Sequence, residues 1–272
     1  MLSFAGVLSV GMIMGATTGC GSNGGDSPVT STSDSTARAG WNLVWHDEFN
    51  GPSLDTGIWN HEVNGDGGGN NELQYYTAEP RNAFLENGTL VIQALKESFS
   101  GKQYTSARLN SDHKKDWLYG RVDVRAKLPY GRGLWPAIWM LPTDWVYGGW
   151  PASGEIDIME LLGHEPTKIY GTMHWGADAA HHLSSGSSFV LSSGSFAGAF
   201  HVFSLEWSAD SIKWFVDDRR YFAQPTIQPF DKRFHMVLNV AVGGNWPGSP
   251  DASTVFPQVM QVDYVRVYSK AN

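Results

Sequence analysis

The chain has 272 residues, of which 17% are charged, and its formal net charge is −8 at pH 7. The basic residues are scattered and form no stripe, which argues against nucleic acid, anionic membrane surfaces and strongly anionic polymers as partners. The single cysteine excludes an internal disulfide bond. The 31 glycines and 12 tryptophans, with few strong helix formers, favour short strands and tight turns.

The N-terminus predicts a segment that directs export. Residues 2–19 are apolar or small and carry no charge, so we expect residues 1–20 to be a cleaved signal peptide. The ATTGC ending resembles a bacterial lipoprotein signal, in which Cys20 would carry a lipid; secretion with a chance cysteine is the alternative. Residues 21–40 are almost free of apolar side chains and predict a flexible linker. Residues 41–272 then form one domain, secreted or lipid-anchored at the cell envelope.

The domain alternates apolar and polar residues with a period of two, the pattern of strands that face a core on one side. Between positions 119 and 128, for example, Val122, Val124 and Ala126 alternate with charged residues. No long segment carries a helical stripe. We therefore predict an all-β fold, a sandwich of two antiparallel sheets in which one sheet bends into a concave cleft. Further strands are predicted within residues 88–96, 201–222, 234–244 and 260–268.

The segment GEIDIME, residues 154–160, places three carboxylates among apolar residues. On a helix Glu155 and Asp157 would point in opposite directions, whereas on a strand residues two apart share a face. Glu160 breaks this period because it lies three residues after Asp157. A one-residue β-bulge at Ile158–Met159 would return Glu160 to the same face. We therefore predict a bulged strand that presents all three carboxylates to the cleft.

Such a strand would separate the Cα atoms of Glu155 and Glu160 by about 13 Å, at about 3.3 Å per step. Side chains that lean together can bring the carboxyl groups to roughly 5 Å, the separation in glycosidases that retain the configuration of the sugar. Three adjacent carboxyls cannot all ionise cheaply, so one should keep its proton and serve as an acid. A calcium site or a solvated edge strand would account for the same residues.

The spacing in GEIDIME resembles the E-x-D-x-x-E signature of glycoside hydrolase family 16. The additional Met159 is similar to the laminarinase-type endo-β-1,3-glucanases of that family, whereas the licheninases lack it. The resemblance covers residues 41–268 and implies a β-jelly-roll and internal cleavage of β-1,3-glucan, with retention of configuration through a covalent glycosyl-enzyme. Other segments that carry it are WHDEFNG, NNELQYY, YTSARL, GLWPAIWMLP, GHEP, GTMHW, PFDKRFHMVLNVAVGGNWPG and VDYVRVY.

The resemblance implies a role for each catalytic position. Glu155 is the expected nucleophile and Glu160 the expected acid/base. Asp157, between them, is expected to hydrogen-bond the nucleophile and tune the pair. His174, in GTMHW, is expected near the acid/base on the next strand; a structural histidine is the plainer alternative.

Sugar-binding residues are expected along the cleft, where aromatic rings can stack on sugars. Pro136, in GLWPAIWML, suggests that its segment is an edge strand or carries a bulge. By contrast, Trp207 and Trp214 lie in regular hairpin strands and are expected in the core. A turn residue and a surface ion pair are the alternatives for Asn71 and Arg108. The predicted substrate-binding residues are Asn71, Glu72, Arg108, Trp135, Trp139, Trp150, His174, Asn245 and Trp246.

The chemistry needs no cofactor, and the resemblance implies at most a structural Ca²⁺ far from the cleft. Its expected ligands are the backbone oxygens of Glu48 and Gly88 together with Asp263. His181 and His182 have no third ligand nearby in the sequence, which argues against zinc. We expect a monomer that binds β-glucan. The alternatives are a mixed-linkage β-1,3-1,4-glucanase, an agarase, a carrageenase or a non-catalytic glucan-binding protein, and the last should have lost a carboxylate.

Overall fold

The structure, a computed structural model, describes residues 36–272; the predicted signal peptide, Cys20 and most of the predicted linker lie outside the described residues. Within 36–272 the one helical element is a 3-10 turn, η1 (Ala179–His181). No helix in this range is long and apolar enough to cross a membrane. Folded structure begins slightly before residue 41, because the Arg38 guanidinium binds Asp123 at 2.8 Å and Asp218 at 2.7 Å.

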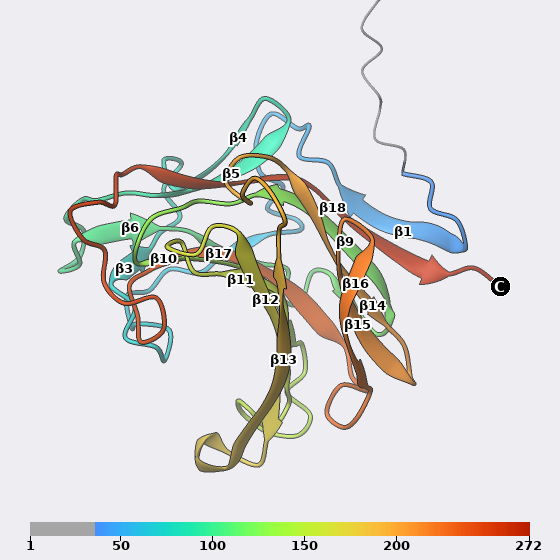
Figure 1. The fold of residues 1–272 in the computed structure, drawn as a ribbon. Helices are drawn as coiled ribbons and strands as arrows, with labels where there is room; N and C mark the ends of the chain where they lie inside the picture. The colour runs from blue at the N-terminus through green and yellow to red at the C-terminus, as the bar shows by residue number, and fades with distance from the viewer. Residues whose placement is uncertain (1–35) are drawn as a thin grey trace, which may run out of the picture. The chain divides into compact units, whose positions relative to one another are not determined.

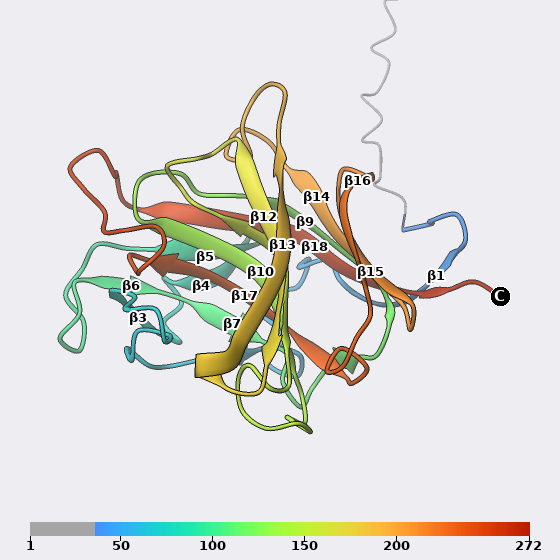
Figure 2. The same ribbon diagram turned by 60° about the horizontal axis from the view of Figure 1, so that its bottom comes forward.

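Two antiparallel sheets of eight strands each form the domain, so the predicted sandwich is confirmed (Figures 1 and 2). The first sheet runs in the order β16 (Arg219–Pro225), β15 (Ser211–Val216), β14 (His201–Trp207), β9 (Gly120–Lys127), β18 (Gln258–Lys270), β5 (Thr89–Ala94) and β4 (Ala83–Glu86), and β1 (Trp41–Asp47) also pairs with β18.

The second sheet carries the strand predicted from GEIDIME. It runs in the order β13 (His182–Val190), β12 (Lys168–Gly176), β11 (Glu155–Leu161), β10 (Leu134–Pro142), β17 (Phe234–Val242), β7 (Arg108–Asn110) and β2 (Asn60–His61), with β8 (Asp116–Trp117) beside β17. A short parallel pair, β3 (Gln74–Tyr76) and β6 (Tyr104–Ser106), is separate from both sheets.

The core lies between the two sheets, as the alternating pattern predicts. On β9, Val122, Val124 and Ala126 are at most 4% exposed. Arg121 and Asp123 on the opposite face are buried too, because they form an ion pair at 2.7 Å and neutralise each other. The predicted hairpin strands β14, β15 and β16 are confirmed, and both tryptophans expected in the core, on β14 and β15, are buried there.

The β15–β16 hairpin turns through two residues only. Asp217 and Asp218 have φ angles of 47° and 61°, the left-handed backbone that a tight two-residue hairpin turn requires. Aspartate tolerates this conformation better than most residues. The Asp217 carboxylate also fixes the turn to β14, because its Oδ1 accepts the N–H of Val202 at 2.9 Å. The turn brings β16 back beside β15.

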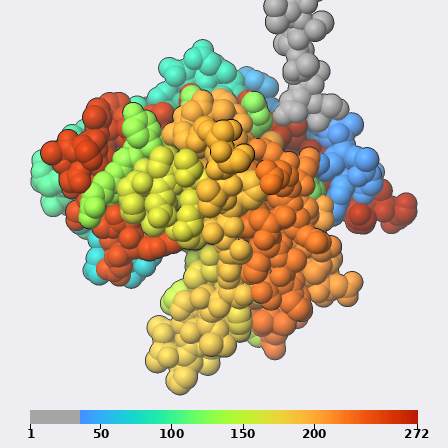
Figure 3. Space-filling model, in the orientation of Figure 1, coloured from blue at the N-terminus to red at the C-terminus, as the bar shows by residue number. Residues whose placement is uncertain are grey.

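β10 lies inside the second sheet, between β11 and β17, so the edge position suggested by Pro136 is wrong. Pro136 pairs with Val240 of β17, but the pairing with β11 ends at Ala137. The proline therefore lies where β10 has a partner strand on one side only. At the far edge of the same sheet, β13 and its connection to β12 project from the domain surface, in gold (Figure 3).

Candidate active site

β11 carries the predicted bulge. Its register with β12 slips by one residue between Asp157 and Glu160. The intervening Ile158 and Met159 are 1% and 0% exposed and belong to the core. Glu155, Asp157 and Glu160 all line one cleft on the opposite face of the strand. The bulge thus reconciles two buried apolar side chains with three carboxylates that share a cleft.

The cleft has a volume of about 1040 Å³ and runs across β7, β17, β10, β11, β12 and β13. Asn71 and Asn245 are not among its lining residues, and their role in sugar binding stays a prediction. The Asn71 side chain is occupied by a hydrogen bond to Asn245 Oδ1 at 2.9 Å, and the neighbouring Asn70 lines the cleft instead. The predicted binding residues that do line it are Glu72, Arg108, Trp135, Trp139, Trp150, His174 and Trp246.

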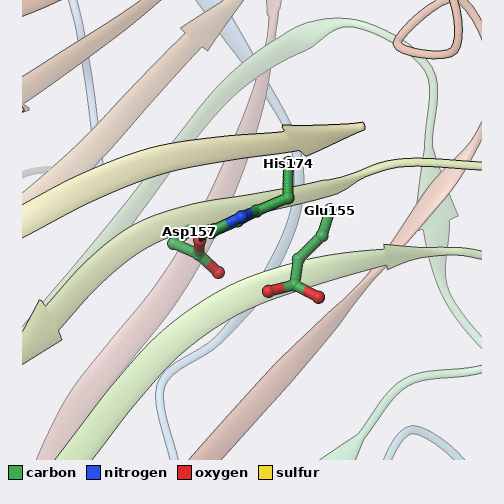
Figure 4. Close-up of side chains that lie close together, drawn as sticks. All are labelled: Glu155, Asp157 and His174. Carbon is green, nitrogen blue, oxygen red and sulfur yellow. Dashed lines mark ion pairs between the residues drawn. The ribbon is translucent and has the colours of Figure 1, made fainter. Parts of the chain in front are cut away.

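Glu155, at the start of β11, meets both a loop and the neighbouring strand. Trp150, in the preceding loop, donates its indole N–H to Glu155 Oε2 at 2.8 Å. His174 pairs with Glu155 across β11 and β12, and its Nε2 lies 3.0 Å from Asp157 Oδ2 (Figure 4). His174 was expected near Glu160 on the next strand: it lies on that strand and its charge lowers the pKa of Glu160, but the register puts it opposite Glu155 and puts Tyr170 opposite Glu160.

His182 extends this group, although its position in the sequence gave no signal of it. Its Nε2 lies 2.8 Å from His174 Nδ1, and its ring packs against Trp150 with centroids 4.9 Å apart. Partial burial and the neighbouring His174 lower the pKa of His182. A continuous series of contacts therefore leads from Asp157 through both histidines and Trp150 back to Glu155.

Glu160, near the end of β11, is enclosed by aromatic rings. The Trp135 indole N–H donates to Glu160 Oε1 at 3.0 Å. Trp246 meets Trp135 edge to face at 5.6 Å and meets Tyr170 at 4.9 Å. Tyr170 was not predicted as a cleft residue, yet it lies two and four residues before Thr172 and His174. The period-two rule on β12 would have placed it on the same face.

The electrostatics of the three carboxyls favour bound protons. Burial, followed by the Asp157 charge, raises the pKa of Glu155 to about 8, while His174 and the Trp150 N–H oppose the rise. Burial, then Asp157 and Glu155, raises the pKa of Glu160 well above its usual value. Burial also raises the pKa of Asp157, and a hydrogen bond with Glu155 partly offsets it. Glu160 is 9% exposed and lies near two other carboxyls, so its protonated form is favoured.

A chain of hydrogen bonds supports the cleft on the β17 side. The Trp139 indole donates to Asn239 at 2.7 Å, and Asn239 donates to the Tyr76 hydroxyl at 3.0 Å. That hydroxyl donates to Glu72 at 3.0 Å. Glu72 therefore braces the cleft wall, and burial raises its pKa. Asn239 lines the cleft but was missed from the sequence, because its contacts come from strands distant in the chain.

Arg108 combines the two roles considered for it. It lines the cleft, where its guanidinium lies over the Trp139 ring at 4.6 Å from the centroid. It also forms an ion pair with Glu62. Its positive charge is therefore partly neutralised before any ligand binds.

The side chains of the expected Ca²⁺ site are engaged elsewhere. Asp263 binds Arg125 at 2.6 Å, and the Glu48 carboxylate binds Arg266 at 2.8 Å. Across residues 36–272, the one group of three or more metal-ligating side chains is Glu155, Asp157 and His174, whose ligand atoms lie within 4.8 Å of one another in the cleft. A Ca²⁺ ion at the expected position would thus depend on backbone oxygens and would compete with Arg125 for Asp263.

The family model "Glycosyl hydrolases family 16" matches residues 70–266. A β-glucanase of Rhodothermus marinus is 45% identical over 84% of this chain and 85% of its own length. Glucan endo-1,3-beta-glucosidase A1 of Niallia circulans is also 45% identical, over 86% of this chain, but the match spans only 39% of that longer protein. The laminarinase catalytic domain of Thermotoga maritima superposes with a TM-score of 0.79 at 44% identity, covering 85% of this chain and 99% of that one. The chain belongs to glycoside hydrolase family 16.

Proposed function

We propose that this glycoside hydrolase cleaves internal bonds of a laminarin-like β-1,3-glucan with retention of configuration. The observation that carries the proposal is the bulged strand β11, which presents Glu155 and Glu160 to one cleft. The similarity to laminarinases and endo-1,3-β-glucosidases supports the choice of glucan. A non-catalytic glucan-binding protein has no need for both carboxylates.

In the proposed first step, Glu155 attacks the anomeric carbon while the bond to the leaving sugar oxygen breaks. Glu160 gives its proton to that oxygen, so the departing chain leaves as an alcohol and the sugar stays on Glu155 as an ester. In the second step Glu160 takes a proton from water, and the water oxygen attacks the anomeric carbon from the face that the leaving group vacated. The ester bond to Glu155 breaks in the same step, and Glu155 leaves as a carboxylate. Two inversions restore the original configuration, and no cofactor takes part.

Asp157 and His174 prepare the nucleophile in this scheme. Glu155 must lose its proton before it can attack, although burial holds its pKa at about 8. The nearby Trp150 N–H and His174 both favour the ionised form. The Asp157 charge raises the pKa of Glu155, so the two carboxyls titrate together and the ionisation of one opposes that of the other.

Aromatic rings supply the surfaces on which sugars would stack. Trp150 and Trp246 are 42% and 41% exposed and belong to the Glu155 and Glu160 ends of the cleft respectively. Trp135 and Trp139 form part of the floor on β10. A cleft with platforms on both sides of the carboxylates suits internal cleavage of a polymer.

The charges in the cleft favour binding of a neutral glucan over a sulfated polymer. Arg108 is the one lysine or arginine among the residues that line the cleft, and it already binds Glu62. A carrageenan sulfate would therefore face three carboxyls with little positive charge to oppose them.

A substrate panel tests the proposal. Purified protein is incubated with laminarin, lichenan, agarose and carrageenan, and the products are sized and followed by proton NMR. We expect fastest release of oligosaccharides from laminarin, with the β-anomer appearing first. Activity confined to a galactan, or an α-anomer as the first product, would contradict it.

Two further proposals concern regions that the cleft does not reach. A structural Ca²⁺ at Glu48, Gly88 and Asp263 remains a prediction; a chelator should lower Tm and leave kcat unchanged at a temperature where the protein stays folded. Export with a lipid on Cys20 also remains a prediction. Radioactive palmitate should label the wild type and not Cys20→Ala, and an unlabelled wild type in the culture medium would instead indicate plain secretion.

A further inference from the structure

Trp214 approaches the catalytic strand from the opposite sheet. It lies on β15 with none of its side chain exposed. Its indole N–H donates to the backbone carbonyl of Asp157 at 2.8 Å. Asp157 is the last residue of β11 in register with β12 before the bulge. A core side chain thus binds the catalytic strand at the point where its ladder is interrupted.

A glycine in β12 makes this contact possible. Because the β11–β12 register passes from Thr172 to Tyr170, Gly171 lies opposite the bulge. A Cβ atom on Gly171 would lie 2.6 Å from Trp214 Cδ1 and 2.3 Å from the Tyr221 hydroxyl oxygen, both far inside van der Waals contact. The two side chains therefore occupy the space that any larger residue at position 171 would fill.

Tyr221, on β16, packs beside Trp214 against the same glycine. Its hydroxyl is buried and has no hydrogen-bond partner among the described residues. Burial and the charges of Glu160 and Asp157 raise its pKa, so the hydroxyl remains neutral behind the carboxylates. Trp214 is consequently the side chain of this pair that holds the bulge by a directed bond, while Tyr221 holds it by packing.

We propose that Trp214 is a positioning residue, whose indole N–H fixes the Asp157 carbonyl and thereby the place of Glu160 relative to Glu155. The inference rests on the proposed function, since it concerns the geometry of that reaction. A bulge can move along its strand, and a one-residue shift turns every following side chain to the other face. Even a partial shift would misplace Glu160, and a 1 Å misplacement costs about 10²-fold in rate.

The test compares two matched substitutions. Trp214→Phe removes the N–H and keeps an aromatic ring in the core. Trp207→Phe is the control, because Trp207 on β14 is 4% exposed and donates to another backbone carbonyl, that of Phe230, at 3.0 Å. Both variants are assayed on laminarin, whose leaving group needs a proton, and on a 2,4-dinitrophenyl β-laminaribioside, whose leaving group does not. Their Tm values are measured alongside.

For Trp214→Phe we expect kcat on laminarin to fall about 10- to 100-fold with KM unchanged. The first-turnover release of dinitrophenolate should stay near the wild-type rate, because that step bypasses the acid. The alkaline limb of the pH profile on laminarin should also move, since Glu160 sits in an altered environment. Trp207→Phe should keep the wild-type kcat on both substrates and the wild-type pH profile.

Two results would overturn the inference. One is a folded Trp214→Phe protein with the wild-type kcat on laminarin; the other is an equal loss on both substrates, which would mark a general structural role. If Trp214→Phe does not fold, 3-benzothienylalanine at position 214 keeps the shape and lacks the N–H, and the same outcomes apply. A wild type inactive on laminarin and on the activated glycoside would instead refute the proposed function, before any variant is examined.

Discussion

The carboxylates at the two ends of β11 each accept a hydrogen bond from a tryptophan indole, but the residues around them differ. Glu155 accepts an indole N–H from Trp150, and Glu160 accepts one from Trp135. At the Glu155 end, burial and Asp157 raise the pKa of the carboxyl to about 8, and His174, the Trp150 N–H and Arg108 oppose the rise. At the Glu160 end, burial and two neighbouring carboxyls favour the acid. Identical side chains on one strand thus acquire opposite tasks from their surroundings.

The largest effect is expected when the Glu155 end loses its carboxylate. Glu155→Ala should lower kcat on laminarin on the order of 10⁴-fold or more, because no covalent intermediate can form. Added azide should then attack an activated β-glycoside directly and give an α-glycosyl azide, which NMR identifies. A folded Glu155→Ala protein with substantial activity on laminarin would contradict the assignment of Glu155 as the nucleophile.

Removing the acid at the Glu160 end should cost less and depend on the leaving group. Glu160→Ala should lower kcat on laminarin by about 10²- to 10⁴-fold. Bond cleavage in the dinitrophenyl glycoside should be far less affected, and azide should give a β-glycosyl azide by attack on the glycosyl-enzyme. Equal losses on both substrates would show that Glu160 does not act as the acid.

The buried acid should also lower stability at alkaline pH. Its folded-state pKa is raised above the ordinary 4.5, so the folded protein binds more protons and stability falls as pH rises through that window. The side-chain amide introduced by Glu160→Gln does not titrate. The free energy of unfolding of this variant should exceed that of the wild type by about 1–3 kcal/mol at pH 8, and the difference should disappear near pH 4.5. Urea unfolding at both pH values measures this, with the exposed Glu86→Gln as control. A gap independent of pH would contradict it.

The smallest expected effects distinguish the two indole donors. Each N–H lowers the pKa of its carboxyl, so its loss should raise that pKa. Trp150→Phe should move the acidic limb of the kcat/KM profile upward, because Glu155 must be ionised. Trp135→Phe should move the alkaline limb upward, because Glu160 must be protonated. Shifts on the order of one pH unit are expected, and a shift of the same limb in both variants would contradict the assignment.

Local periodicity was enough to predict the central strand. Alternation placed Glu155 and Asp157 together, and the odd spacing of Glu160 required the bulge that β11 shows. At Pro136 the same reasoning was half right: β10 is an interior strand, but its register with β11 does shift between Ile138 and Trp139, close to the proline. Strand period and bulge are properties of the local sequence, whereas the extent of pairing depends on the neighbouring strand.

The cleft was predicted less completely, since its lining depends on register and loops. His174 was expected near Glu160, and its charge does act on Glu160, but the antiparallel register of β11 and β12 puts its backbone opposite Glu155. Asn71 binds Asn245 from another loop, a contact that no local pattern predicts. His182 and Asn239 enter the site through contacts between distant segments, and no spacing in the sequence predicts such contacts.

Covalent trapping tests the assignment of the two ends most directly. The wild type is treated with a 2-deoxy-2-fluoro-laminaribiosyl fluoride, which forms the glycosyl-enzyme readily and hydrolyses slowly, and the labelled residue is located by peptide mass spectrometry. The different surroundings of the two carboxyls predict a single label on Glu155. A label on Glu160 or Asp157, or rapid inactivation without a sugar ester, would contradict the roles that the structure supports.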